Sequence, residues 1–290
     1  MIKWLVLICV ILFACIVEWI RELFTFKVTH YNINSNKLNG LLQKKKIIFL
    51  SDLHNNSYGK DNLRLINSIR EQSPDLILIG GDMLVGNEDV SSEVAEKFVK
   101  ELTHICPVYY ANGNHEQRLK IYPEKYGTKY EEYKEKLSKL GVVFLENEHV
   151  NLKWDECQIQ IHGLEIPREG YKKFKRTTLS LEQVVNRVGQ TEQSKYQILL
   201  AHNPIYVDTY MKWGADLILS GHLHGGVVRI PGLGGIITPQ FRFFPKYSGE
   251  LTVKEGKTVV VSKGLGTHTI KIRFMNPAEV VVLHIGGNKK

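Results

Sequence analysis

The chain alternates short apolar runs with longer segments in which apolar residues recur every three or four positions. The short runs have the length and composition of buried strands, and the periodic segments have the spacing of helices packed on a sheet. A strand–helix–strand rhythm of this kind predicts a mostly parallel sheet. The predicted strands of this region are Lys46–Leu50, Leu76–Ile79 and Val108–Tyr110, and the predicted helices are Asp61–Glu71 and Glu88–Thr103.

The rest of the chain is predicted to form shorter elements. Phe26–Ile33 alternates as a strand does and is expected to open the first sheet. The polar stretch that begins at Gln117 is predicted to be a loop, followed by a helix over Lys129–Leu140. Val142–Ile161 is expected to give short strands, and the glycine-rich region after Gly226 to give antiparallel strands that complete a second sheet. The fold class that follows is α/β.

The first 24 residues are apolar enough to form a membrane segment. Trp4–Val17 contains no charge, and a membrane span needs about 20 apolar residues. That length is reached if the flanking charges lie at the interfaces, where Trp4 and Trp19 would also be well placed. We therefore expect residues 1–24 to form an uncleaved, single-pass transmembrane helix and residues 25–290 to form one domain.

Two other interpretations of this segment stay open, and so does its orientation. The run is short for a span, so it could instead be a buried core helix. Leu12–Cys15 faintly resembles a bacterial lipoprotein cleavage box. The expected location is the cell membrane. Lys3 and the amino terminus compete with Arg21, Lys27 and Lys37 in setting the orientation, which leaves the membrane face undecided.

The composition of the chain limits the kinds of molecule that it is expected to bind. The chain has 290 residues, 43% of them hydrophobic, which is enough for a sizeable core. Its formal net charge of +8 favours anionic partners such as phosphate-bearing substrates or acidic lipids. Nucleic acid is disfavoured because the chain has no helix-turn-helix or RNA-binding signature. The four cysteines form neither a disulfide framework nor a zinc-binding pattern.

Five short polar blocks hold seven side chains that can bind metal ions. Most of these blocks directly follow an apolar run that is predicted to be a strand. Loops at the carboxyl ends of neighbouring strands converge on one edge of a sheet, so ligands far apart in the sequence can meet there. The seven side chains are those of Asp52, His54, Asp82, Asn114, His202, His222 and His224.

The spacing and the kinds of donor favour two transition-metal ions. Asp52 and His54 are separated by one residue, and alternate residues of an extended strand project to the same side, so both could reach one ion. Mixed carboxylate, amide and imidazole donors suit manganese, iron or zinc better than calcium. Seven donors would over-supply a single ion. Two divalent ions about 3.5–4 Å apart, bridged by Asp82, would use them all.

In this order the blocks resemble the motifs of the calcineurin-like metallophosphoesterase superfamily. The motifs occur in the order Asp-x-His, Gly-Asp, Gly-Asn-His-Glu, a single His and Gly-His-x-His. The resemblance extends over about residues 45–285. The resemblance implies a two-sheet β-sandwich flanked by helices. Within the superfamily the chain is most similar to bacterial membrane-associated enzymes that hydrolyse phosphodiesters or UDP-2,3-diacylglucosamine, and the tail from Gly264 to Glu279 shares that likeness.

The resemblance also implies a role for each residue. His115 would not be a ligand; it would contact the phosphoryl group and assist the leaving oxygen in an in-line attack by hydroxide on phosphorus. Val85 departs from the pattern, because many relatives carry an acid three residues after the bridging Asp. The first ion would be held by Asp52, His54, Asp82 and His224, and the second by Asp82, Asn114, His202 and His222.

The leading hypothesis is a phosphohydrolase that cleaves a phosphodiester or pyrophosphate bond in a lipid-linked or nucleotide-containing substrate. The alternatives are a phosphomonoesterase and a metal-bound binding module that has lost catalysis. Two basic insertions, 117–140 and 167–180, carry aromatic residues that either contact acyl chains or form ordinary loops. They are Tyr122, Tyr126, Tyr130, Tyr171 and Phe174; the segment from Phe241 to Tyr247 is a third such patch or packs between the sheets.

Overall fold

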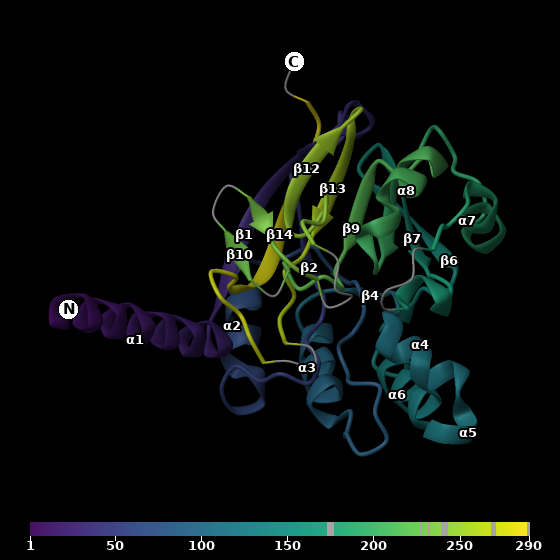
Figure 1. Ribbon diagram of the computed structural model, residues 1–290. Coiled ribbons are helices and arrows are strands. Elements are labelled where there is room, and N and C mark those ends of the chain that lie inside the picture. The colour runs from purple at the N-terminus through teal and green to yellow at the C-terminus, as the bar shows by residue number, and fades with distance from the viewer. Residues whose placement is uncertain (173–176, 227, 231–232, 239–242, 268–270, 289–290) are drawn as a thin grey trace.

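Two six-stranded sheets form the frame of the domain in the computed structural model (Figure 1). The structure describes the chain except for residues 173–176, 227, 231–232, 239–242, 268–270 and 289–290. The first sheet has the order β1 (Phe26–Asn34), β14 (Ala278–Gly286), β2 (Lys45–Leu50), β3 (Leu76–Ile79), β4 (Val108–Tyr110) and β5 (Val143–Phe144). The second has the order β12 (Glu250–Lys254), β13 (Lys257–Val261), β9 (Leu217–Ser220), β8 (Tyr196–Ala201), β7 (Cys157–Leu164) and β6 (Glu148–Trp154).

Helices cover the outer faces of both sheets. Beside the first sheet lie α2 (Leu63–Glu71), α3 (Glu93–Thr103), α4 (Asn114–Ile121), α5 (Pro123–Tyr126) and α6 (Lys129–Ser138), and beside the second lie α7 (Leu181–Val188) and α8 (Val207–Trp213) (Figure 1). Shorter elements are the 3-10 turns η1 (Asn36–Leu38), η2 (Lys60–Asn62), η3 (Arg168–Tyr171) and η4 (Pro204–Tyr206), and the ribbon β10 (Arg229–Ile230) with β11 (Gly234–Gly235). The α/β class and the two-sheet architecture are therefore confirmed.

The two sheets share one core between them. In β2, Ile47 and Phe49 belong to the core cluster that also contains Ile198 of the second sheet, whereas Ile48 and Leu50 belong to the cluster that contains the buried residues of α2 and α3. Strand residues point alternately to opposite faces, so a strand buried on both faces must be apolar throughout. This requirement explains the continuous apolar runs that made β2, β3 and β4 predictable.

The prediction for the region between 117 and 128 was wrong, since α4 begins at Asn114 and is followed by α5. The helix has no apolar period because all but one of its buried positions are polar: Asn114, His115, Glu116 and Gln117 are buried together with Leu119. Two of these side chains, His115 and Glu116, make hydrogen bonds around the site described below. Hydrophobic periodicity could not reveal a helix of this kind.

The prediction that the last strand completes the second sheet was wrong. β14 lies in the first sheet, parallel to β1 and antiparallel to β2, rather than completing the second sheet. The second sheet is also only partly antiparallel, since β7, β8, β9 and β13 run parallel to one another. Strand pairing between distant segments depends on which apolar faces meet, which local patterns do not specify.

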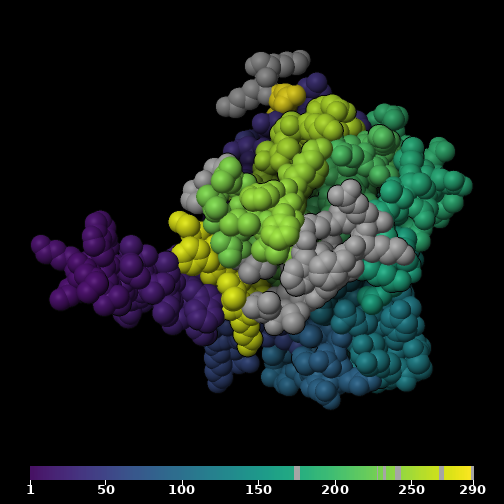
Figure 2. Space-filling model, viewed as in Figure 1, coloured from purple at the N-terminus to yellow at the C-terminus, as the bar shows by residue number. Residues whose placement is uncertain are grey.

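The N-terminal helix α1 (Ile2–Phe24) projects away from the domain (Figures 1 and 2). Its most apolar stretch of 18 residues contains no buried residue. The interpretation as a buried core helix is therefore wrong. By length and composition α1 is a candidate membrane anchor, and it ends two residues before β1 begins.

Candidate metal centre

Loops after five strands bring the predicted site residues together between the two sheets. The loops after β2, β3 and β4 belong to the first sheet, and those after β8 and β9 to the second. No side chain of the group is more than 8% exposed. In strand order the residues are Asp52 and His54, Asp82, Asn114 and His115, His202, and His222 and His224.

The backbone turns sharply at five of these residues. Their φ angles are positive: 56° at Asp52, 48° at His54, 55° at Asp82, 67° at His222 and 49° at His224. Non-glycine residues adopt this region rarely, at a cost of about 1–3 kcal/mol each, and such strain is concentrated at functional sites. The expectation that Asp52 and His54 project from an extended strand end is wrong, because left-handed turns aim them instead.

Asp52, His54 and His224 form one group of possible ligands. Oδ1 of Asp52 lies 3.4 Å from Nε2 of His224 and 3.8 Å from Nε2 of His54. The two Nε2 atoms are 3.2 Å apart. Ligands that each bind one ion at about 2.0–2.2 Å must lie about this close to one another. The group therefore fits a single first-row ion.

Asp82, His202 and His222 form a second group, whose ligand atoms also lie within 4.8 Å of one another. Oδ2 of Asp82 is 3.1 Å from Nε2 of His202. The same oxygen is 3.8 Å from Nε2 of His54, so Asp82 lies between the two groups. A carboxylate in this position can be shared by two ions.

Asn114 adds an oxygen that is suited to a cation. Its Oδ1 is buried and accepts no hydrogen bond from the residues that the structure describes. A buried polar atom left in this way costs about 1–3 kcal/mol. A metal ion would remove that cost. The residues present therefore fit a pair of divalent ions.

Carbonyl groups orient two of the histidine rings. Nδ1 of His202 lies 2.6 Å from the carbonyl oxygen of Gly80, and Nδ1 of His224 lies 3.2 Å from that of Gly266. A carbonyl oxygen only accepts, so in both rings Nδ1 carries a proton, and Nε2 is the nitrogen that can bind an ion once it is deprotonated. This is the tautomer that a metal ligand needs.

The buried carboxylates make the site attractive to positive charge. Burial raises the pKa of Asp52 to about 6, although His202 opposes this. Burial would also raise the pKa of Asp82, but His202 and His115 hold it well below its usual range. Burial would lower the pKa of His202, yet Asp82 and Asp52 raise it to about 10. Divalent ions would satisfy the same two carboxylates.

His115 is held differently from the other histidines. The backbone N–H of Gly86 donates to its Nδ1 at 2.8 Å, so the ring proton is on Nε2. Nε2 lies 4.0 Å from Oδ2 of Asp82, which is therefore an acid close to the ring. The donor atoms of His54, Asp82 and His115 lie within 4.8 Å of one another, so proximity alone does not separate His115 from the ligands.

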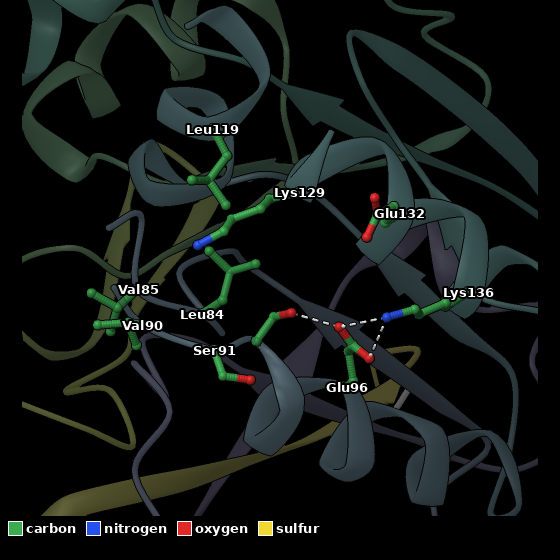
Figure 3. A pocket seen from close by; sticks show the side chains of 10 residues that line it. Leu84, Val85, Val90, Ser91, Glu96, Leu119, Lys129, Glu132 and Lys136 are labelled. Atoms are coloured by element: carbon green, nitrogen blue, oxygen red, sulfur yellow. Dashed lines mark hydrogen bonds and ion pairs between the residues drawn. The ribbon is translucent and has the colours of Figure 1, made fainter. Parts of the chain in front are cut away.

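The loop that supports His115 borders a cavity of about 190 Å³ (Figure 3). Val85, the position that departs from the family pattern, contributes an apolar wall. Glu96, on another wall, accepts from Ser92 at 2.5 Å and from Lys136 at 3.2 Å.

Glu116 connects two loops of the site, a role that was not predicted from the sequence. Its carboxylate accepts from the backbone N–H groups of Asp82 at 2.9 Å, Met83 at 2.9 Å and Gly113 at 3.0 Å, and from the hydroxyl of Tyr110 at 2.7 Å. It therefore joins the loops after β3 and β4. A glutamate next to predicted ligands in a Gly-Asn-His-Glu block was the only sequence signal for this role.

The first insertion is only partly available to a substrate. Tyr130 is 2% exposed and its hydroxyl is hydrogen-bonded to Glu146 and Asn112, so it cannot contact an acyl chain. Tyr122 is 39% exposed and lies under the guanidinium of Arg168, 5.6 Å from the ring centre.

The other two aromatic segments lie differently. The ring of Tyr171 is 5.0 Å from that of His222, which places the second insertion beside the candidate site. Phe174, Phe241 and Arg242 lie outside the described residues. Phe243 and Phe244 are 67% and 63% exposed, so these two do not pack between the sheets.

Comparison with known proteins agrees with this geometry. The family model described as calcineurin-like phosphoesterase matches residues 45–226. The chain belongs to the calcineurin-like phosphoesterase family. It is therefore a metal-dependent phosphoester hydrolase, of a family that uses a dinuclear divalent metal centre.

Individual relatives show how far the likeness extends. An uncharacterised metallophosphoesterase of Aquifex aeolicus is 29% identical over 268 residues, covering 92% of this chain and 94% of the relative. A transmembrane protein with metallophosphoesterase domain from Danio rerio is 26% identical over 261 residues, covering 88% of this chain and 56% of the relative. The crystal structure of phosphopantetheinyl hydrolase from Mycobacterium tuberculosis superposes with a TM-score of 0.51 at 14% identity, covering 81% of this chain and 97% of that one. At that identity it supports the fold alone.

Proposed function

We propose that this chain hydrolyses a phosphodiester or pyrophosphate bond in a lipid-linked or nucleotide-containing substrate. The observation that carries the proposal is the convergence of two donor groups with Asp82 between them. One ion would be held by Asp52, His54, Asp82 and His224, and the other by Asp82, Asn114, His202 and His222.

Two ions of manganese, iron or zinc would supply positive charge to the phosphoryl oxygens and acidify a water molecule. The chain contributes rigidity. Oδ1 of Asp82 accepts from the backbone N–H of His115 at 2.8 Å, and both oxygens of Asp52 accept from that of His222 at 3.0 Å. These bonds prevent the carboxylates from rotating away from the ions, so little reorganisation accompanies the reaction.

His115 is the residue that we assign to the substrate. With Nδ1 facing the N–H of Gly86, its Nε2–H can donate a hydrogen bond to a phosphoryl oxygen or to the leaving oxygen. That bond strengthens as negative charge develops on the oxygen when the P–O bond breaks. His115 acts in this proposal as a hydrogen-bond donor through its Nε2–H.

The substrate class rests on the surroundings of the site. The exposed apolar helix α1 is a candidate anchor that would keep the domain close to lipid, and we propose the cell membrane as its location. The net charge of +8 favours an anionic substrate. In this proposal residues 1–24 form the anchor and residues 25–290 the metallophosphoesterase domain.

The test compares a phosphodiester with a phosphomonoester. The full chain in detergent, loaded with Mn²⁺, is assayed on bis-p-nitrophenyl phosphate and on p-nitrophenyl phosphate. We expect kcat/KM for the diester to exceed that for the monoester by about tenfold or more. A monoester preference would support the runner-up, a phosphomonoesterase. Two bound ions without turnover of either substrate would overturn the proposed activity.

A further inference from the structure

The last two turns of α1 are attached to the loop between β13 and β14. Glu22 is the one buried residue of α1, with 1% of its surface exposed. Its two carboxylate oxygens accept a hydrogen bond from the backbone N–H of Asn276, at 3.0 and 2.9 Å. Three residues earlier, the indole N–H of Trp19 donates to the carbonyl of Lys271 at 3.0 Å. Figure 2 shows this yellow segment against the purple end of the helix.

The same loop holds the backbone of His224. Asn276 is fully buried, and its Nδ2 donates to the carbonyl oxygens of His224 at 2.6 Å and Gly226 at 2.8 Å. The fit is close, because a Cβ on Gly225 would lie 2.2 Å from Oδ1 of Asn276. Asn276 thus connects the anchor helix to the turn that carries a proposed ligand.

The loop also holds the ring of His224 through Arg273. This arginine is 2% exposed and donates to the carbonyl oxygens of Lys263, Gly264 and Gly266. The carbonyl of Gly266 in turn accepts from Nδ1 of His224. Both ends of His224, its peptide and its imidazole, are therefore positioned by contacts with Asn276 and Arg273.

The turn at His224 needs such support. His224, Gly225 and Gly226 have successive φ angles of 49°, 74° and 75°. A run of left-handed residues that includes a histidine persists only where its surroundings determine it. Glu22 adds to this support from α1, because its carboxylate holds the backbone N–H of Asn276, the residue whose side chain binds the turn.

We propose that Glu22 is a positioning residue for the metal centre: the end of the anchor helix clamps the loop that holds His224. The inference rests on the proposed function in one respect, because it takes His224 as a ligand of the first ion. The helix is then a structural part of the centre as well as a tether. Weakening the clamp lowers affinity at the His224 ion and spares the ion held by Asn114, His202 and His222.

The experiment measures Mn²⁺ binding to the full chain in detergent by electron paramagnetic resonance, which distinguishes a spin-coupled ion pair from a single ion. Glu22→Gln keeps the shape of the side chain but leaves one acceptor oxygen in place of two. Glu18→Gln is the matched control, since Glu18 lies one turn earlier on the same helix and pairs with Arg21 at the surface. Asn276→Asp removes the donor to His224 from the other end of the link.

In the wild type and in Glu18→Gln we expect a coupled pair. In Glu22→Gln and Asn276→Asp we expect one ion with unchanged affinity and the second bound at least tenfold more weakly, so that the coupled spectrum is lost at the Mn²⁺ concentration that fills the wild type. A coupled pair of unchanged affinity in Glu22→Gln, or equal weakening of both ions, would overturn the inference.

Three further outcomes also have a defined meaning. If Glu22→Gln does not fold, Glu22→Asp, which shortens the side chain by one methylene, is held to the same criterion. If the wild type binds no pair of ions, the proposed function fails and the inference fails with it. A wild-type pair that hydrolyses neither ester overturns the activity alone, because the ion-binding readout is independent of turnover.

Discussion

Gly113→Ala tests whether the position of Asp82 controls metal binding. A Cβ at residue 113 would lie 2.2 Å from Oδ1 of Asp82 and 2.6 Å from its backbone nitrogen. Non-bonded contacts of this kind are essentially absent below 3.0 Å, so the carboxylate must move by about 0.8 Å or more. Residue 113 cannot easily move instead, because its N–H donates to Glu116 at 3.0 Å.

The expected loss of affinity follows from that displacement. Metal–ligand distances in working sites vary by only about 0.2 Å, so a shift about four times larger breaks the bonds of a shared carboxylate. Removing only an outer partner of a ligand typically costs about 10–100-fold in affinity. We expect at least a 100-fold weaker affinity for Mn²⁺, together with about 1–3 kcal/mol of lost stability from overpacking.

Isothermal titration with Mn²⁺ and elemental analysis of the purified full chain measure the affinity and the ion content. Gly141→Ala is the control: its φ is +91° and its Cβ would meet nothing within 4 Å, so it adds backbone strain away from the site. We expect that variant to lose about 1 kcal/mol of stability and to keep both ions. Two ions bound to Gly113→Ala with wild-type affinity would refute the reasoning.

Three further predictions concern the chemistry, the pH dependence and the core. Asp82→Ala should abolish ion content and turnover, whereas His115→Ala should lower kcat by about 100-fold with both ions retained; ion loss in His115→Ala would show that His115 is a ligand. Burial lowers the pKa of His162 from 6.5 to about 4, so between these pH values the unfolded chain binds a proton that the folded chain does not, and stability falls as the pH falls. In urea unfolding, the free energy of unfolding of the wild type should fall by about 2 kcal/mol more between pH 8 and pH 5 than that of His162→Gln. An equal fall in both proteins would contradict this prediction. Phe98 is fully buried in the core between α3 and the first sheet, so Phe98→Ala should lower the free energy of unfolding by about 3–5 kcal/mol. Leu63 is 53% exposed, so Leu63→Ala should lower it by less than about 1 kcal/mol. Similar midpoints of thermal unfolding for the two variants would contradict this packing.

Some of the site could be predicted because its residues follow apolar strands. β2, β3 and β4 carry continuous apolar runs, and the polar residue that ends each run marks the edge where loops meet. α4 could not be predicted in this way, since most of its inner face is polar and is built from residues such as Asn114, His115 and Glu116. Where polar side chains replace the core, hydrophobic periodicity is lost together with the signal for a helix.

The sequence by itself determined the local elements of the first sheet, the apolar character of the N-terminal helix and the kinds of donor available for metal ions, because these follow from short-range patterns and side-chain chemistry. Only the tertiary structure decided that β14 lies between β1 and β2, that left-handed turns aim Asp52 and His54, and that Glu22 meets Asn276. These features join segments as far as 254 residues apart. Contacts of that kind depend on which surfaces pack together in three dimensions, and no spacing along the chain encodes them.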